Sequence, residues 1–190
     1  MLIMINMSYK KGTFGDDLSF LRKHLEPIVL KDGKRQIVVS PEFQGRVFTS
    51  TSRGLEGDSY GWFNKNIISS DSAKLNMSKV GGASRIWFGP DQGPNTVFVR
   101  VDSETNEKVK GAPVDLDEVQ FQISKKSNTS VAMGSKMHIE NNKGFQFYLD
   151  VNRKVELLDF KDVISNLHIS LNDKIEFVAF KAETTITISL

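Results

Sequence analysis

Hydrophobic and polar residues alternate along the second half of the chain, and this spacing of two residues is typical of strands that bury one face. Polar side chains occupy the intervening positions of the third apolar row, so that strand has a wet face and a dry face. Asn141–Gly144 reads as the hairpin between the second and third rows. The three apolar rows are Val119, Phe121 and Ile123; Val131, Met133, Met137 and Ile139; and Phe145, Phe147, Leu149 and Val151.

The first half of the chain predicts one helix followed by strands. In Asp16–Leu25, leucines recur at helical spacing and Asp16 can cap the first turn. From Ile28 onwards the spacing becomes two, and Asp32-Gly33 is a strong signal for a hairpin turn. The predicted strands of this half are Ile28–Lys31, Arg35–Val39, Arg46–Thr51 and Thr96–Val101.

Three more strands are predicted in Val163–Ser170, Lys174–Lys181 and Thr184–Leu190. Roughly a dozen strands and one helix predict an all-β protein, an antiparallel β-sandwich with a short N-terminal helix. We expect residues 1–15 to form a flexible N-terminal segment and residues 16–190 to form a single domain.

Arg153 departs from the alternation, because its position places it on the dry side of its strand between Val151 and Val155. An inward arginine is costly unless it is paired. It either marks a strand end where the side chain reaches out to water, or it belongs to a buried network or a binding site.

Residues Val80–Asn95 combine breakers of regular structure with two large side chains. Six of these sixteen residues are Gly or Pro, and they enclose Arg85 and Trp87. Because side chains alternate in an extended segment, both point to the same face. A guanidinium beside an indole suits sugar binding, since it donates paired hydrogen bonds while the indole stacks on the sugar ring. The alternative is a core Trp87 and a surface Arg85.

A second aromatic cluster lies in Gly57–Asn64, where two glycines space Tyr60, Trp62 and Phe63. It can form a second wall of a binding pocket or simply a packed loop. The sequence favours neither interpretation.

Composition limits the classes of partner. With 39% hydrophobic and 25% charged residues the chain has enough apolar material for a core. The net charge is only +2 and the basic residues are scattered, so we expect neither a nucleic-acid nor a membrane partner. The chain has no cysteine, which excludes disulfides and thiolate metal sites. Taken as written it is expected in the cytoplasm; a processed or re-cut N-terminus would be compatible with the periplasm.

Motifs for cofactors and metals are not found. His24, His138 and His168 lie far apart in the sequence, so no metal site is predicted. There is no P-loop or dinucleotide fingerprint, and no cofactor is expected. Carboxylates such as Glu42, Glu56, Asp58 and Asp91 lie near glycines and aromatic residues, but the sequence cannot pair them as acid and base.

Several segments, taken together and in this order, resemble an uncharacterised group of bacterial proteins related to the galactose mutarotases (aldose 1-epimerases). Arg153 matches an arginine that this group has within an otherwise apolar strand. The resemblance covers most of residues 17–183. The matching segments are Val39–Thr51, Tyr60–Asn64, Gly81-Gly82 with Arg85–Pro90 and Gly93, and Asn141–Leu158.

This resemblance implies a β-supersandwich of the mutarotase type whose concave sheet holds a sugar. It implies that Arg85 contacts sugar hydroxyls and that Trp87 is a stacking wall. Where the group tends to have acidic residues before the arginine, this chain has Ala83-Ser84. Mutarotases use a general base and a histidine acid, and the segments that would carry them lie beyond Leu190. The catalytic residues are therefore unknown.

We therefore expect a shortened, mutarotase-like carbohydrate-binding protein without full epimerase activity, which binds a mono- or oligosaccharide. The candidate binding residues are Arg46, Trp62, Arg85, Trp87 and Arg153. One alternative is a sugar-active enzyme that uses Glu42 or Asp91, or a site completed by a partner chain. Another is a structural or interaction protein. Thr184–Leu190 is expected to leave an exposed sheet edge, which favours a homodimer.

Overall fold

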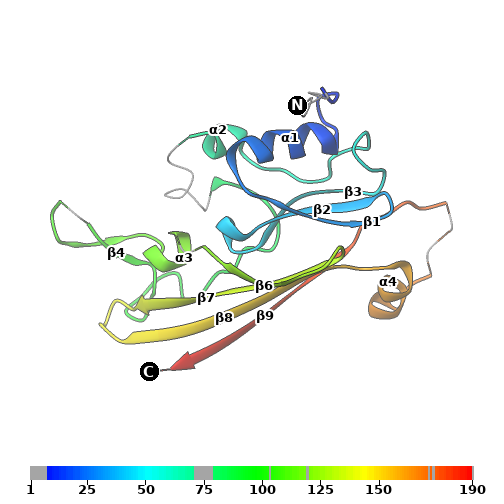
Figure 1. The fold of residues 1–190 in the computed structure, drawn as a ribbon. Coiled ribbons are helices and arrows are strands. Elements are labelled where there is room, and N and C mark those ends of the chain that lie inside the picture. The colour runs from blue at the N-terminus through cyan, green and yellow to red at the C-terminus, as the bar shows by residue number, and fades with distance from the viewer. Residues whose placement is uncertain are drawn as a thin grey trace.

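The described residues form three layers, a helix on a small sheet on a larger sheet (Figure 1). The computed structural model describes residues 8–70, 79–102, 104–118, 120–170, 172 and 174–189. Among these residues, no helix is both long and apolar enough to cross a membrane. The predicted class, an all-β antiparallel sandwich with a short N-terminal helix, is confirmed.

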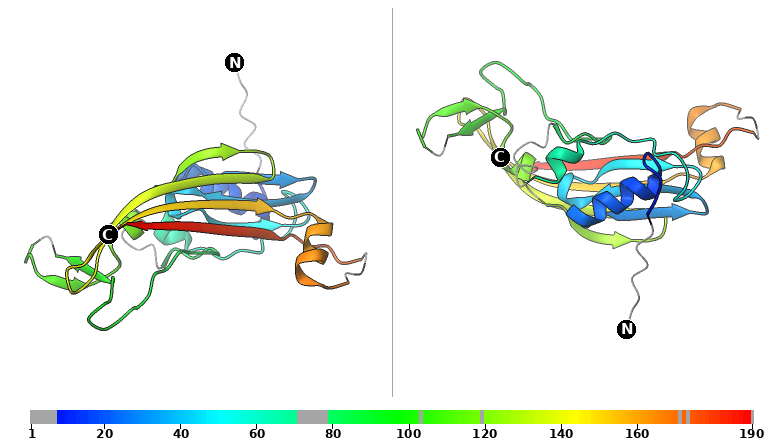
Figure 2. Two further views of the ribbon diagram at one scale, coloured as in Figure 1. Left: turned by 90° about the horizontal axis from the view of Figure 1, so that it is seen from below. Right: turned by 90° about the horizontal axis from the view of Figure 1, so that it is seen from above.

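The N-terminal helix α1 spans Phe14–His24 and begins two residues earlier than predicted. The Thr13 side chain, not Asp16, caps it by accepting a hydrogen bond from the Asp16 N–H. Basic residues occupy the last turn, where the helix dipole favours positive charge. Figure 2 shows α1 lying across the outer face of the first sheet, where Phe14 and Leu21 are fully buried.

The first sheet has the order β1-β2-β3, with β1 Ile28–Asp32, β2 Arg35–Ser40 and β3 Arg46–Thr51. The predicted hairpin forms one residue later than expected, because Asp32 pairs with Arg35 and leaves Gly33 and Lys34 in the turn. A short 3-10 helix, η1, spans Pro41–Phe43 before β3. Both faces of this sheet are covered, by α1 above and by the larger sheet below, so β2 and β3 are buried almost throughout, whereas the end of β1 is exposed.

The larger sheet has the order β6-β7-β8-β9. These strands are β6 Gln122–Lys126, β7 Ser130–Glu140, β8 Gln146–Leu157 and β9 Phe180–Ser189. The second apolar row is buried as predicted, and so are Leu149 and Val151 of the third. Phe145 is exposed, and in the first row Ile123 is half exposed while Phe121 is buried. Val119 lies outside the described residues.

The main core lies between the two sheets. Apolar side chains of β1, β2 and β3 meet those of β7 and β8 there, which explains why the clean alternation of the second half predicted its buried positions well. A second cluster lies between the first sheet and α1. Its members are Phe14, Leu18, Leu21, Val38, Phe43, Phe48, Phe63, Ile68 and Val80.

The region after β8 corrects three strand predictions. Val163–Ser170 is not a strand: α4 spans Phe160–Leu167, because Asp159 and Asp162 form a reciprocal capping box that favours a helix start. The predicted strands Lys174–Lys181 and Thr184–Leu190 are replaced by the single long strand β9, which is the edge of its sheet. The described residues thus form nine strands instead of a dozen.

The remaining elements are short. Helix α2 spans Lys65–Ile68 and α3 spans Val114–Glu118. The strands β4 Val99–Val101 and β5 Lys108–Lys110 form a separate hairpin that projects from one end of the molecule (Figure 2). Only the end of the predicted strand Thr96–Val101 therefore pairs in a sheet.

Candidate functional site

The loop that carries Arg85 lies along the edge of the first sheet. Gly81, Gly82 and Ser84 all have positive φ angles, of 87°, 79° and 69°. The backbone of Ala83 exchanges two hydrogen bonds with Val47 of β3, at 2.8 and 3.2 Å. Glycine suits Gly81 and Gly82 because this left-handed backbone is disfavoured for residues with a Cβ atom. The loop is thus fixed to β3 without being a regular strand.

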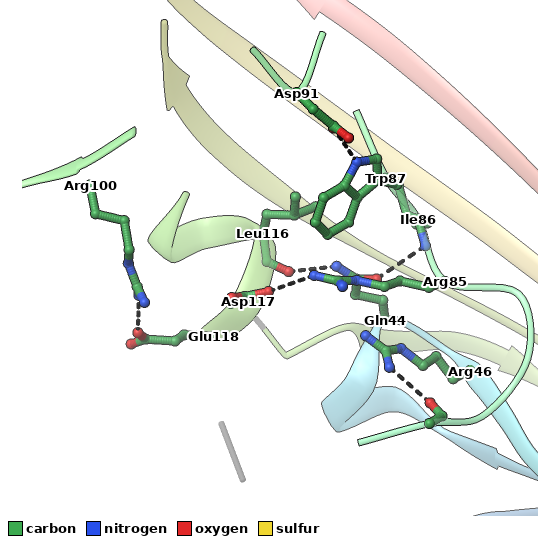
Figure 3. A network of polar contacts seen from close by, with 11 residues as sticks. Gln44, Arg46, Arg85, Ile86, Trp87, Asp91, Arg100, Leu116, Asp117 and Glu118 are labelled. Atoms are coloured by element: carbon green, nitrogen blue, oxygen red, sulfur yellow. Dashed lines mark hydrogen bonds and ion pairs between the residues drawn. The ribbon is translucent and has the colours of Figure 1, made fainter. Parts of the chain in front are cut away.

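Arg85 meets an acidic partner from a distant part of the sequence. Its Nη2 donates to Asp117 Oδ1 of α3 at 3.0 Å. The side chain of Gln44 holds the same two segments together: its amide donates to the Leu116 carbonyl at 2.5 Å and its oxygen accepts from the Ile86 N–H at 3.1 Å. Figure 3 shows Gln44 between the loop and α3, with Arg85 pointing toward Asp117.

Arg46 and Arg153 belong to opposite sheets, and both are buried, with 2% and 4% of their surface exposed. Arg46 of β3 donates to the Gly81 carbonyl at 2.9 Å. Arg153 of β8 donates to the Ser84 carbonyl and to Thr184 Oγ1. Arg153 therefore points inward, as the alternation predicted. The interpretation that it marks a strand end is wrong, because it pairs with Met133 and Thr184 in mid-sheet.

The three arginines lie close together. A Cβ atom on Gly45, next to Arg46, would lie 3.1 Å from Cδ of Arg153, so Arg153 packs directly on this backbone. The charges of Arg85 and Arg153 both act on Arg46. The structure thus brings three of the candidate residues, Arg46, Arg85 and Arg153, together in one cluster, which we call the arginine cluster.

Burial lowers the pKa of all three arginines, and at Arg46 the charges of the other two lower it further. The pKa of Arg46 falls to about 10, chiefly because the group is removed from water and then because of the Arg85 charge. Burial also lowers the pKa values of Arg85 and Arg153. It raises the pKa of Asp117, and the Arg85 charge opposes that rise. Holding these groups charged in the interior is therefore unfavourable.

The arginine cluster also has more donors than acceptors. Among the described residues, five buried side-chain nitrogen or oxygen atoms have no hydrogen-bond partner, and four of them belong to the cluster: Arg46 Nε and Nη2, Arg85 Nε and Arg153 Nε. The fifth is Ser40 Oγ. A buried donor without an acceptor costs about 1–3 kcal/mol, and more on a charged group. Costs of this kind often mark sites shaped for binding instead of stability.

Trp87 is neither a core residue nor a free stacking surface. It is 45% exposed, and its ring stacks on Phe98 at 4.3 Å between centroids. The Arg85 guanidinium lies 4.1 Å from the same ring centroid, which confirms the predicted approach of these two side chains. Two groups this close to one ring occupy its opposite faces, so only the edge of the indole is open. Its Nε1 donates to Asp91 Oδ1 at 2.6 Å.

Trp62 is the more open of the two tryptophans, at 68% exposed. A Cβ atom on Gly81 would lie 2.7 Å from Trp62 Cε3, so the indole rests against the residue whose carbonyl holds Arg46. Its neighbour Phe63 is buried in the core beneath α1. The aromatic cluster of Gly57–Asn64 therefore sends one ring inward and leaves Trp62 on the surface beside the loop.

Two residues of the site were missed by the sequence analysis, Gln44 and Asp117. Gln44 is fully buried with a positive φ of 61°, and the only signal was the break between β2 and β3. Asp117 gave no signal, since it stands in an acidic segment that reads as a surface turn. Two of the carboxylates considered as an acid or a base accept hydrogen bonds. Glu42 accepts one from the Glu26 N–H, and Asp91 accepts one from Trp87 Nε1. In the described parts of the chain, no three His, Asp or Glu side chains gather to hold a metal ion.

We expect Arg46→Met to change the free energy of unfolding by less than about 1 kcal/mol near neutral pH, because relief of the buried charge offsets the lost bond to Gly81. The folded-state pKa of about 10 lies below the usual pKa of an arginine, so above about pH 10 the folded protein releases the Arg46 proton while the unfolded protein still holds it. The wild type should therefore gain stability relative to the variant as the pH rises above that value.

Urea unfolding of both proteins, near neutral pH and above about pH 10, measures the difference in the free energy of unfolding between wild type and variant. Arg53→Met is the control, because Arg53 is an exposed partner of Glu176. A loss of about 3 kcal/mol or more for Arg46→Met would instead assign Arg46 to structural support.

The searches of curated proteins and of solved structures each found no match. One family model matches residues 12–189, a range that includes every residue of the arginine cluster and both tryptophans. The chain therefore belongs to the family of unknown function DUF6786.

Proposed function

We propose that this protein binds a carbohydrate at the surface formed by Trp62, the loop of Gly81–Trp87 and the arginine cluster. The observation that carries the proposal is the excess of buried N–H donors on three converging arginines. Sugar hydroxyl and ring oxygens are acceptors that can satisfy such donors. The exposed indole of Trp62 beside the loop supplies a surface on which the C–H face of a sugar can stack.

The three arginines differ in how accessible they are to a ligand. Arg85 is the outermost arginine, with 18% of its side chain exposed, and the two inner arginines lie behind the carbonyls of Gly81 and Ser84. A ligand therefore meets Arg85 and Trp62 first. Its oxygens reach Arg46 and Arg153 only where the Gly81–Ser84 backbone moves aside.

We also propose a fold relationship to the galactose mutarotases, which rests on the resemblance of the sequence segments and on the two packed antiparallel sheets. Epimerisation needs an acid and a base at the sugar. Within the described residues, the hydrogen-bond and ion-pair partners of the arginine cluster include one carboxylate, Asp117, and no histidine. This supports binding without full epimerase activity.

A titration with a panel of monosaccharides and oligosaccharides, read by tryptophan fluorescence, tests the proposal. The chain has only two tryptophans and both border the site, so the signal reports on it directly. We expect saturable quenching that Arg85→Ala abolishes and that the surface control Arg53→Ala leaves unchanged. Trp62→Phe should remove most of the signal and Trp87→Phe much less.

A flat response across the panel, in protein shown to be folded by circular dichroism, would contradict carbohydrate binding. It would favour a structural or interaction role for the family. Turnover of a sugar that binds would instead favour the sugar-active enzyme.

We further propose a homodimer through β9. This strand is the edge of its sheet, and Ile188 is 60% exposed beside an apolar groove of about 460 Å³ that also contacts Phe88 and Pro90. An unprotected apolar edge favours pairing with a second copy.

Light scattering over a wide concentration range should show a mass that rises toward the dimer. Ile188→Lys should keep the protein monomeric, whereas Ile123→Lys on the opposite edge strand should not; a constant monomer mass would contradict the dimer.

A further inference from the structure

The charges of the arginine cluster do not balance. Three guanidinium groups converge, and Asp117 is the one carboxylate among the described residues that pairs with any of them. Arg46 and Arg153 have only neutral partners there: the backbone carbonyls of Gly81 and Ser84 and the hydroxyl of Thr184. Three positive charges therefore share the single negative charge of Asp117, which also acts on Arg46, and the cluster keeps an excess of positive charge. Neutral hydroxyls would satisfy its donors without balancing this charge.

The free donors of Arg46 have a specific arrangement. Its Nη1 donates to the Gly81 carbonyl, whereas Nε and Nη2 have no hydrogen-bond partner among the described residues. These two nitrogens form one edge of the planar guanidinium, and their N–H bonds run parallel. This is the edge that binds a carboxylate, phosphate or sulfate group through two hydrogen bonds at once.

Nearby acidic residues do not fill this role. Asp117 is held by Arg85 at 3.0 Å, and Glu118 is turned away to Arg100 at 2.7 Å, as Figure 3 shows. The loop residues in front of the inner arginines, Ala83 and Ser84, are neutral. The described protein thus presents a cationic interior edge behind a neutral loop.

We infer that the arginine cluster is an oxyanion site, with the free edge of Arg46 as its main donor pair and Arg153 and Arg85 beside it. Resting on the proposed carbohydrate function, this makes the ligand an acidic saccharide, one that carries a carboxylate, phosphate or sulfate group. The acidic group enters the cluster and the sugar ring lies outside it, toward Trp62.

Paired titrations at constant ionic strength test this inference, with galacturonate against galactose, glucose 6-phosphate against glucose, and sodium sulfate alone. An acidic sugar should bind about tenfold or more tightly than its neutral match, because hydrogen bonds to a charged acceptor are roughly twice as strong. Arg46→Met should weaken the binding of acidic sugars about tenfold more than that of their neutral matches, which removes this preference. The exposed control Arg53→Met should change neither.

Asp117→Asn is a second variant, and its expected effect on anion binding is the opposite of that of Arg46→Met. Removing the one carboxylate frees Arg85, so acidic sugars and sulfate should bind more tightly and should raise the melting temperature more than in the wild type. A merely structural role for Asp117 predicts a lower melting temperature that anions do not restore.

Each outcome bears on one of the two proposals. Equal affinity for acidic and neutral sugars would overturn the oxyanion site and leave carbohydrate binding standing. Saturable binding of sulfate that depends on Arg46, with no saccharide bound, would support the oxyanion site and overturn carbohydrate binding. No response to any of these compounds would overturn both.

Discussion

Two buried arginines, one from each sheet, hold the Gly81–Trp87 loop in place. Arg46 on β3 binds the Gly81 carbonyl and Arg153 on β8 binds the Ser84 carbonyl, so a single loop is tied to both layers of the sandwich. Each arginine uses only part of its donor capacity in doing so. The loop positions Arg85 and Trp87, so these two bonds set the geometry of the site together with the Ala83–Val47 backbone bonds and the bond from Ile86 to Gln44.

This arrangement is a costly way to fix a loop. Apolar side chains of similar volume would close the same interior without removing charge from water. The cluster instead retains unpaired donors and a charge excess beneath a backbone with three positive φ angles. Functional sites often carry a cost to stability. On the proposed function, this cost and the capacity to bind have one origin.

The sequence predicted the parts of the structure that depend on local pattern. Alternation placed Val131, Met133 and Val151 in the core and turned Arg153 inward, and the spacing of two residues brought Arg85 beside Trp87. Alternation did not predict the burial of β2 and β3, because both faces of these strands are covered. It also predicted a strand after β8 from β-branched residues, where a capping box instead favours the helix α4.

The rest of the site depends on contacts between residues far apart in the chain. Asp117 meets Arg85 across 32 positions and Gln44 meets Leu116 across 72, so no local spacing could reveal either pair. Local spacing gave no sign of the stacking of Phe98 on Trp87 either, and this contact covers one face of the indole. Sequence reasoning identified the arginines but not what surrounds them.

The most direct test of this account is the NMR spectrum of the arginine Nε–H groups in isotope-labelled protein, recorded with and without galacturonate. The account predicts slowly exchanging signals for Arg46, Arg85 and Arg153 in the free protein, because their Nε atoms are buried. Saturating galacturonate should shift these three signals and leave that of exposed Arg53 unchanged. Cluster signals that exchange rapidly with water, or that stay in place when every acidic sugar has been added, would contradict it.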